Sequence, residues 1–192
     1  MSEVKNILLA GVGGQGIILA SKILATGLID AGYDVKMSEV HGMAQRGGSV
    51  TTQVRFGEKV YSPIIGKGQA DILVSFETME TGRYVEFLKA DGKVVLNDFE
   101  MPSAVILSGA AEYPTGVVES VQEKFETTVI KAADLAQELG NIKTMNVIIV
   151  GALIKAMGLQ DLNWKAVIEK TVKEKFVDMN LKAIELGMSQ VK

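Results

Sequence analysis

A glycine-rich turn near the start of the chain constrains the fold more than any other feature. Residues 6–10 form a short, continuously apolar run, which is typical of a strand buried on both faces of a parallel sheet. The letters GVGGQG follow at once at positions 11–16 and satisfy the spacing G-x-G-x-x-G. Apolar residues then recur at helical spacing from Ile17 to Leu28. The order of strand, glycine turn and helix predicts the opening of a Rossmann-like unit.

The remainder of the chain continues this alternation. Strands are expected at residues 34–39, 49–56, 71–76, 93–97, 104–107 and 128–130, and helices at 78–89, 132–139 and from 144 onward. The first two strands and the helix between them have the length of a βαβ crossover. A hairpin-type turn at residues 57–59 is expected to lead into a short strand at 60–62. We therefore predict an α/β fold: a Rossmann-like, mostly parallel sheet with helices on both faces and a small antiparallel β insertion.

The composition excludes several functional classes. The 192 residues include no cysteine and a single histidine, which excludes disulfides and cysteine-ligated iron–sulfur clusters and argues against a metal site. A net charge of −3 is not the signature of a nucleic-acid-binding protein. The N-terminal residues do not resemble a signal peptide, and the longest apolar runs are much shorter than the roughly 18 residues that span a membrane. We expect a cytoplasmic protein that contacts neither membrane nor nucleic acid.

The glycine turn is the first candidate binding site. Glycine permits a positive φ and close approach of a phosphate, and free N–H groups at the helix start attract anions. The candidate residues here are Gly11, Gly13, Gly14, Gln15 and Gly16. The acidic residue that would bind a ribose is not well placed, because Asp34 begins the second strand and Glu39 comes late. A second interpretation stays open, in which the glycines serve only close packing of helix on sheet. The turn predicts binding, but not NAD in particular.

The loop after the second strand is the second candidate. Residues 38–49 are expected beyond the carboxyl end of that strand, where ligands bind in open α/β sheets. The candidates are a carboxylate, the only histidine, a guanidinium and two glycines: Glu39, His41, Arg46, Gly47 and Gly48. Arg46 could hold a phosphate or carboxylate through two hydrogen bonds. It could equally pair with Glu39 or with another subunit, and a lone histidine is more often a loop hydrogen-bonding residue than a catalyst. No catalytic residue is assigned.

Together the two candidate segments resemble a known family. The turn, residues 38–49 and the stretches around Arg55, Ser62 and Asp71 are similar to the gamma domain of 2-oxoacid:ferredoxin oxidoreductases. The resemblance covers nearly the whole chain, so residues 1–192 are expected to form a single pyruvate/ketoisovalerate oxidoreductase gamma-type domain. It is greatest to the beta subunit of indolepyruvate ferredoxin oxidoreductase. One departure is Gln53, where the arylpyruvate branch is expected to carry histidine.

The resemblance implies a reaction and a partner. The reaction is oxidative decarboxylation of a 2-oxoacid, most simply indolepyruvate or another arylpyruvate, to an acyl-CoA with reduction of ferredoxin. This chain is expected to hold no cofactor alone, although its two candidate segments could contact coenzyme A. Thiamine diphosphate, magnesium and iron–sulfur clusters are expected on a large partner subunit, and ferredoxin would be reached through the complex. Apolar surface shaped for that partner could also let the isolated chain form a homodimer.

Three alternatives remain at this point. The chain could be a gamma subunit that serves 2-oxoglutarate, pyruvate or a branched-chain 2-oxoacid. It could instead be a stand-alone NAD(P)-binding dehydrogenase, which would bind nicotinamide dinucleotides by itself. Or it could be a non-catalytic nucleotide-binding module that binds a ligand without turnover and without a large companion.

Overall fold

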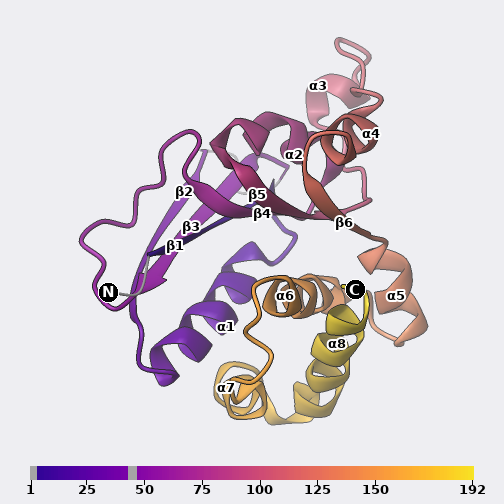
Figure 1. The fold of residues 1–192 in the computed structure, drawn as a ribbon. Helices are drawn as coiled ribbons and strands as arrows, with labels where there is room; N and C mark the ends of the chain where they lie inside the picture. The colour runs from indigo at the N-terminus through magenta and orange to yellow at the C-terminus, as the bar shows by residue number, and fades with distance from the viewer. Residues whose placement is uncertain (1–3, 43–46) are drawn as a thin grey trace.

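One mixed β-sheet organises the chain. The computed structural model describes residues 4–42 and 47–192, and the sheet has six strands in the order β2-β3-β1-β4-β5-β6 (Figure 1). The strands are β1 (Lys5–Val12), β2 (Asp34–His41), β3 (Ser49–Gly57), β4 (Ala70–Ser75), β5 (Leu88–Asn97) and β6 (Glu126–Ile130). β1, β4, β5 and β6 pair in parallel, and β3 is antiparallel to both of its neighbours.

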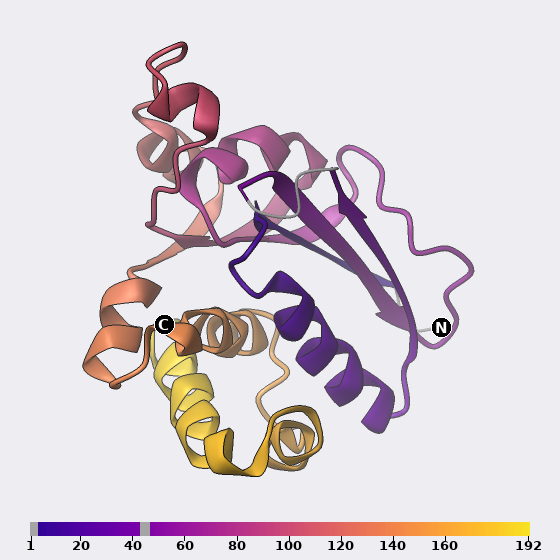
Figure 2. The same ribbon diagram turned by 180° about the vertical axis from the view of Figure 1, so that it is seen from behind.

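Helices cover both faces of this sheet. The α-helices are α1 (Ile17–Asp30), α2 (Thr78–Tyr84), α3 (Ala104–Leu107), α4 (Val117–Gln122), α5 (Ala132–Glu138), α6 (Met145–Ala156), α7 (Trp164–Thr171) and α8 (Val177–Ser189). Short 3₁₀ turns lie at Val85–Phe87, Ile142–Thr144 and Glu174–Phe176. The larger core cluster joins one sheet face to α1, α5, α6, α7 and α8, and the smaller cluster lies under α2 and α4. Figure 2 shows the first group of helices together on one side of the sheet. The predicted α/β fold with a mostly parallel sheet is confirmed.

The antiparallel element differs from the prediction. β1 and β2 run in the same direction but do not pair, because β3 lies between them. The predicted strand at residues 60–62 is wrong, since residues 58–69 form a loop. That loop is fixed by side chains of the sheet: Gln53 Oε1 accepts a hydrogen bond from Ile65 N at 2.6 Å, and Arg55 Nη1 donates to Ser62 O at 2.9 Å. β3 pairs with β1 and β2, and not with a hairpin strand formed by residues 60–62.

Two other elements were predicted wrongly. The apolar run at residues 104–107 is the four-residue helix α3, not a strand, and none of its residues is buried. The helix predicted at 78–89 ends at Tyr84, and Leu88 begins β5 instead. Leu88 is buried and pairs with Ala70 of β4. Tertiary pairing overrides the local helical pattern there.

Helices α6 and α8 pack very closely against each other. Ten of the twelve residues of α6 are buried, so this helix is surrounded by protein. A Cβ atom placed on Gly151 would lie 2.2 Å from the carbonyl oxygen of Ile184, and one on Gly187 would lie 1.9 Å from that of Ile148. The two helix backbones thus touch through glycines, and this contact supports the layer on which α1 rests.

Candidate functional site

The glycine turn lies at the carboxyl edge of the sheet, immediately after β1. Gly14 and Gly16 have φ angles of 106° and 79°, which residues other than glycine rarely adopt. A Cβ on Gly16 would lie 2.5 Å from Asn146 Nδ2, and one on Gly11 would lie 2.8 Å from Phe76 Cβ. A Cβ on Gly14 would meet nothing within 4 Å. Gly11 and Gly16 therefore serve close packing, whereas Gly14 borders open space.

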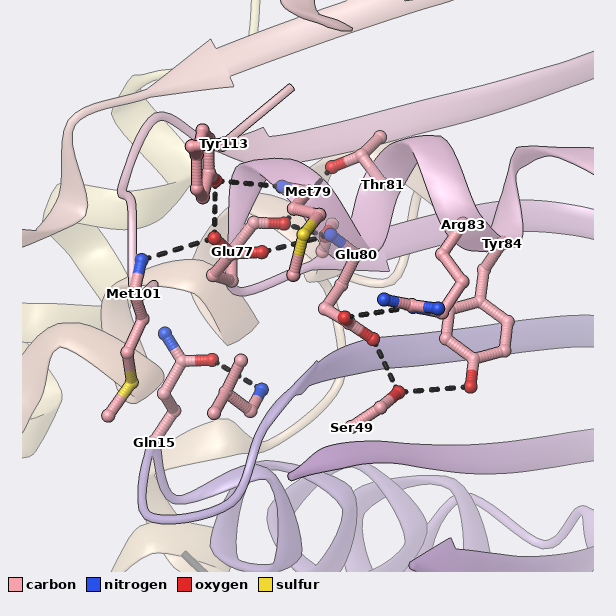
Figure 3. A network of polar contacts seen from close by, with 12 residues as sticks. Gln15, Ser49, Glu77, Met79, Glu80, Thr81, Arg83, Tyr84, Met101 and Tyr113 are labelled. Carbon is pink, nitrogen blue, oxygen red and sulfur yellow. Dashed lines mark hydrogen bonds and ion pairs between the residues drawn. The ribbon is translucent and has the colours of Figure 1, made fainter. Parts of the chain in front are cut away.

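Gln15 joins the ends of two neighbouring parallel strands. Its side chain is buried, and its Oε1 accepts a hydrogen bond from Val12 N at 2.8 Å (Figure 3). Its Nε2 donates to Phe76 O at 2.8 Å. Val12 ends β1 and Phe76 follows β4, so the amide bridges the place where the chain changes direction across the sheet. Such switch points are where α/β sheets bind ligands. The two hydrogen bonds of the Gln15 side chain thus hold the glycine turn against the ends of β1 and β4.

The amino terminus of α1 is open. Its N-cap residue is Gly16, none of the described side chains caps it, and its first turn holds no acidic residue. By contrast, α2 is capped by the buried carboxylate of Glu77, which accepts a hydrogen bond from Glu80 N. The first N–H groups of a helix have no partner within the helix, and the helix dipole makes this end attractive to anions. The fourteen-residue α1 thus begins at the glycine turn with a terminus of the kind that attracts anions.

The structure brings the end of β2 to this same place. A pocket of about 460 Å³ is lined by the turn, the start of α1 and the tips of β2 and β3: Val12, Gly13, Gly14, Gly16, Ile17, Ile18, Glu39, His41 and Val50. Glu39 and His41 pair with Thr52 and Val50 of β3, a register that turns both side chains to the α1 face of the sheet. Two candidate segments that are about 25 residues apart in sequence therefore line one pocket.

The loop that follows β2 is tied to the turn by backbone hydrogen bonds. Gly13 N donates to Gly48 O at 2.8 Å, and Gly47 N donates to Gly13 O at 3.2 Å. Arg46, the predicted anion-binding guanidinium, lies outside the described residues. Gly47 and Gly48 thus fix the loop's exit beside the turn, and a role of these residues in ligand contact stays a prediction.

Two further hollows border the turn. One of about 270 Å³ lies between Val12, Gly47 and the α2–α3 region, and one of about 440 Å³ lies between the turn and the start of α6. The second contains Lys143 and Asn146. Asn146 Nδ2 donates to Gly16 O at 3.1 Å, while its buried Oδ1 has no hydrogen-bond partner among the described residues. Sequence reasoning did not identify Asn146, because 130 residues separate it from the turn and no local motif marks it.

A buried carboxylate supports the start of β3. Glu80 is 1% exposed; it accepts a hydrogen bond from the Ser49 hydroxyl and one from Arg83 Nε at 3.0 Å (Figure 3). The Ser49 hydroxyl also lies 3.1 Å from the Tyr84 hydroxyl. Ser49 follows directly on Gly47 and Gly48, so α2 fixes the exit of the loop through a charge-assisted hydrogen bond. The sequence offers no signal for this network.

A second buried carboxylate, Glu77, holds Tyr113. The Tyr113 hydroxyl donates to Glu77 Oε1, which also accepts a hydrogen bond from Met101 N at 3.1 Å. Burial, and then the hydrogen bond to Glu77, raise the pKa of Tyr113 well above its ordinary value of 10.0. The phenol stays protonated, and the Glu77 carboxylate joins its own segment to those of Met101 and Tyr113 (Figure 3).

Tyr113→Phe is expected to weaken the loss of stability at alkaline pH. The folded state holds the phenolic proton more tightly than the unfolded chain, so this stabilisation is complete below pH 10 and is lost as the pH rises above it. From pH 10 upward, urea titrations should show the unfolding free energy of the wild type falling faster than that of the variant. Tyr61→Phe, at a side chain 90% exposed, should follow the wild type. Equal slopes for all three proteins would contradict this assignment.

The described residues hold no metal site of their own. Within residues 4–42 and 47–192, no group of three or more histidine, cysteine, aspartate or glutamate side chains could hold a metal ion. Fold and site together define a Rossmann-like α/β protein with an open helix terminus and no redox centre built from its own cysteines.

Comparison with known proteins places the chain in a family. The model of the pyruvate ferredoxin/flavodoxin oxidoreductase family matches residues 6–190, and the chain belongs to this family. It is 42% identical over 193 residues to the indolepyruvate oxidoreductase subunit IorB of Thermococcus kodakarensis, covering 97% of this chain and 96% of that protein. The family resemblance seen in the sequence is confirmed, and the chain is a subunit of a 2-oxoacid oxidoreductase.

Two solved structures share its fold. One is the gamma subunit of a keto/oxoacid ferredoxin oxidoreductase from Geobacter sulfurreducens, with a TM-score of 0.72, 22% identity and 97% coverage of both chains. The other is the 2-oxoglutarate:ferredoxin oxidoreductase of Magnetococcus marinus with 2-oxoglutarate, coenzyme A and succinyl-CoA bound. Its TM-score is 0.74 at 21% identity, and the match covers 99% of this chain but 31% of that one. In the second protein the fold is thus one part of a longer polypeptide.

Proposed function

We propose that this chain, as a single domain over residues 1–192, holds coenzyme A for a 2-oxoacid:ferredoxin oxidoreductase. The observation that carries the proposal is the uncapped amino terminus of α1, which opens into the pocket between the turn and β2. A diphosphate suits a helix terminus that lacks a side-chain cap. Two more hollows beside the turn offer room for a long ligand, and Asn146 Oδ1, which finds no partner within residues 4–42 and 47–192, could accept a hydrogen bond from it. The coenzyme A in the Magnetococcus marinus protein of the same fold supports this choice of ligand.

The remaining chemistry belongs to a large partner subunit. A chain without cysteine cannot ligate iron–sulfur clusters through thiolates, and its described residues offer no metal-binding group. Thiamine diphosphate with its magnesium, the clusters and the docking site for ferredoxin would therefore lie on that partner. When bound there, thiamine diphosphate supplies the carbanion stabilisation that decarboxylation needs. This chain's part is to orient the acyl acceptor.

Indolepyruvate, or another arylpyruvate, is the proposed substrate. Support comes from 42% identity to an indolepyruvate oxidoreductase subunit over nearly the full length of both chains. Gln53 does not weaken this inference, because its side chain holds Ile65 of the loop at residues 58–69, and it does not line the pocket beside the turn. Acyl-CoA formation by the assembled enzyme, measured with indolepyruvate, 2-oxoglutarate, pyruvate and a branched-chain 2-oxoacid, separates the alternatives.

Arg46→Ala in the assembled enzyme tests the coenzyme A assignment. Loss of a bidentate guanidinium–phosphate contact should raise the apparent KM for coenzyme A about tenfold or more, with little change in that for the 2-oxoacid. Lys59→Ala, at a cation near Tyr61 on the loop at residues 58–69, serves as the control. Equal effects of Arg46→Ala on both substrates, or none, would count against the proposal.

The strand order and the positions of the acidic residues on β2 argue against a stand-alone NAD(P)-dependent dehydrogenase. β3 separates β2 from β1, so Glu39 lies one strand further from the turn than the ribose-binding acid of a Rossmann unit. Asp34 at the other end of β2 is engaged by Lys36 and by Val60 N. Calorimetric titration of the isolated chain with NAD and NADP should show no binding.

The cellular setting follows from the same proposal. No helix among residues 4–42 and 47–192 is long and apolar enough to cross a membrane. We place the complex in the cytoplasm, where a reducing environment suits ferredoxin and iron–sulfur chemistry on the partner.

A further inference from the structure

One segment of the chain has no place in the two helical layers. Residues 98–116, here called the protruding segment, leave the sheet after β5 and return at α4, and stand out from the body of the molecule in both ribbon views (Figures 1 and 2). Between residues 104 and 116, every side chain except Ile106 and Tyr113 is exposed. Val105 and Leu107 of α3 are 56% and 76% exposed. Apolar side chains at the tip of a projection contribute nothing to the core of this chain.

The base of the protruding segment is nevertheless rigidly held. Glu77 is 0% exposed, and its carboxylate accepts hydrogen bonds from Met101 N on the outgoing limb and from the Tyr113 hydroxyl on the returning limb. Met79 N in turn donates to the Tyr113 hydroxyl at 3.0 Å (Figure 3). Fixing both limbs on α2 sets the position of α3 before any partner binds. A preorganised element loses little conformational entropy on association.

The protruding segment also lies in a stretch with charge of a single sign. Residues 94–123 contain no lysine or arginine. They contain five acidic residues, all of them exposed: Asp98, Glu100, Glu112, Glu119 and Glu123. Contact between two copies through this face would oppose carboxylates to carboxylates, which disfavours association. The face therefore suits a different molecule with an apolar groove and a basic rim.

We propose that the protruding segment is the element that docks this chain onto its large oxidoreductase partner, with Val105 and Leu107 in an apolar groove and the carboxylates against basic side chains around it. This inference rests on the proposed function, which supplies that partner. Large apolar side chains at the centre of a contact with a charged rim are the usual anatomy of a specific interface. The surrounding carboxylates would chiefly speed association and select the partner.

Docking at this segment would also complete the ligand site. The hollow of about 270 Å³ beside the glycine turn has one wall made by the protruding segment, through Met101, Ser103, Ile106, Ala111 and Glu112. Its other wall includes Val12 and Gly47 of the turn and loop. A partner seated on α3 would thus border a hollow that shares Val12 with the pocket of the proposed coenzyme A site. Assembly and ligand binding would be adjacent on the same edge of the sheet.

Leu107→Ser and Ile29→Ser form a matched pair that tests the proposal. Both residues are exposed aliphatic side chains on helices, 76% and 57% exposed, but Ile29 lies in the body of the molecule on α1. Binding of each full-length variant to the separately prepared large subunit is measured by biolayer interferometry. Leu107→Ser should raise the Kd at least tenfold with an unchanged melting temperature of the free chain, whereas Ile29→Ser should bind as the wild type does. Glu100→Gln/Glu112→Gln should lower the association rate and flatten its dependence on salt.

The outcomes separate this inference from the proposed function. If the wild-type chain binds no thiamine- and cluster-bearing subunit, the proposed function itself fails. If it binds and Leu107→Ser binds equally well, only the docking inference is overturned. If Leu107→Ser instead converts a dimer of the free chain to a monomer in sedimentation experiments, the face serves a second copy and the inference is also overturned.

Discussion

Gly151→Ala is expected to destabilise the chain by about 3 kcal/mol. The added Cβ would lie 2.2 Å from the carbonyl oxygen of Ile184, and its two next nearest neighbours are also backbone atoms of that residue. Neither helix can yield by rotating a side chain, so α6 and α8 must separate and lose contacts along their length. The unfolding free energy of the isolated chain, from urea titration, measures the effect.

Gly82→Ala is the matched control for this prediction. Gly82 lies in α2 with an exposed surface, and an added Cβ would meet Val117 Cγ1 at 3.4 Å, an ordinary van der Waals contact. Replacing a helical glycine by alanine there should leave stability unchanged or raise it by up to about 1 kcal/mol. If Gly151→Ala were as stable as Gly82→Ala, the close contact between α6 and α8 would not exist in solution.

Local patterns were sufficient for the part of the fold that positions the turn. The predicted strand at residues 6–10 lies within β1, and the predicted helix from Ile17 to Leu28 lies within α1. Both were predictable because the pattern of apolar residues that buries each element is contained in a short stretch of sequence. The strand pairing was not accessible in the same way. The partners of β3 depend on which edges remain free after the crossover from β1 to β2, and the side-chain alternation of β3 is the same for either pairing.

Some residues of the candidate site could be predicted from the sequence and others could not. The turn and the end of β2 could be named from sequence because each carries unusual residues next to a strand end. The contacts of Asn146, Glu80 and Ser49 could not, since each is made across 31 or more residues. The family resemblance supplied a reaction, but contacts of this kind came only with the three-dimensional structure.

The same distinction applies to the two interpretations of the glycines. The packing interpretation holds at two positions, and ligand binding at a third stays a prediction. Gly11 and Gly16 are required by neighbouring atoms, which is the packing interpretation, while Gly14 faces open space beside an uncapped helix end. An acidic substitution at that end of α1 distinguishes packing alone from packing with ligand binding. The negative charge should stabilise the free chain in either case, but it should weaken ligand binding only if the helix end binds an anion.

Ile18→Glu is therefore expected to change stability and ligand binding in opposite directions. Ile18 is 60% exposed in the first turn of α1 and lines the pocket beside the glycine turn. A carboxylate there should stabilise the free chain by about 0.3–1 kcal/mol through the helix dipole. Repulsion of a bound phosphate at close range should raise the apparent KM for coenzyme A in the assembled enzyme about tenfold, an effect that added salt would reduce. The KM for the 2-oxoacid should not change.

Two further variants isolate the cause of that effect. Ile18→Gln has nearly the same shape without the charge, and its KM for coenzyme A should stay close to that of the wild type. Ile29→Glu places the same carboxylate at the other end of α1, where Ile29 is 57% exposed. It should lower the stability of the free chain slightly and leave the KM for coenzyme A unchanged. A gain of stability in Ile18→Glu with an unaltered KM would mean that the open end of α1 holds no anion during turnover, and that the turn serves packing alone.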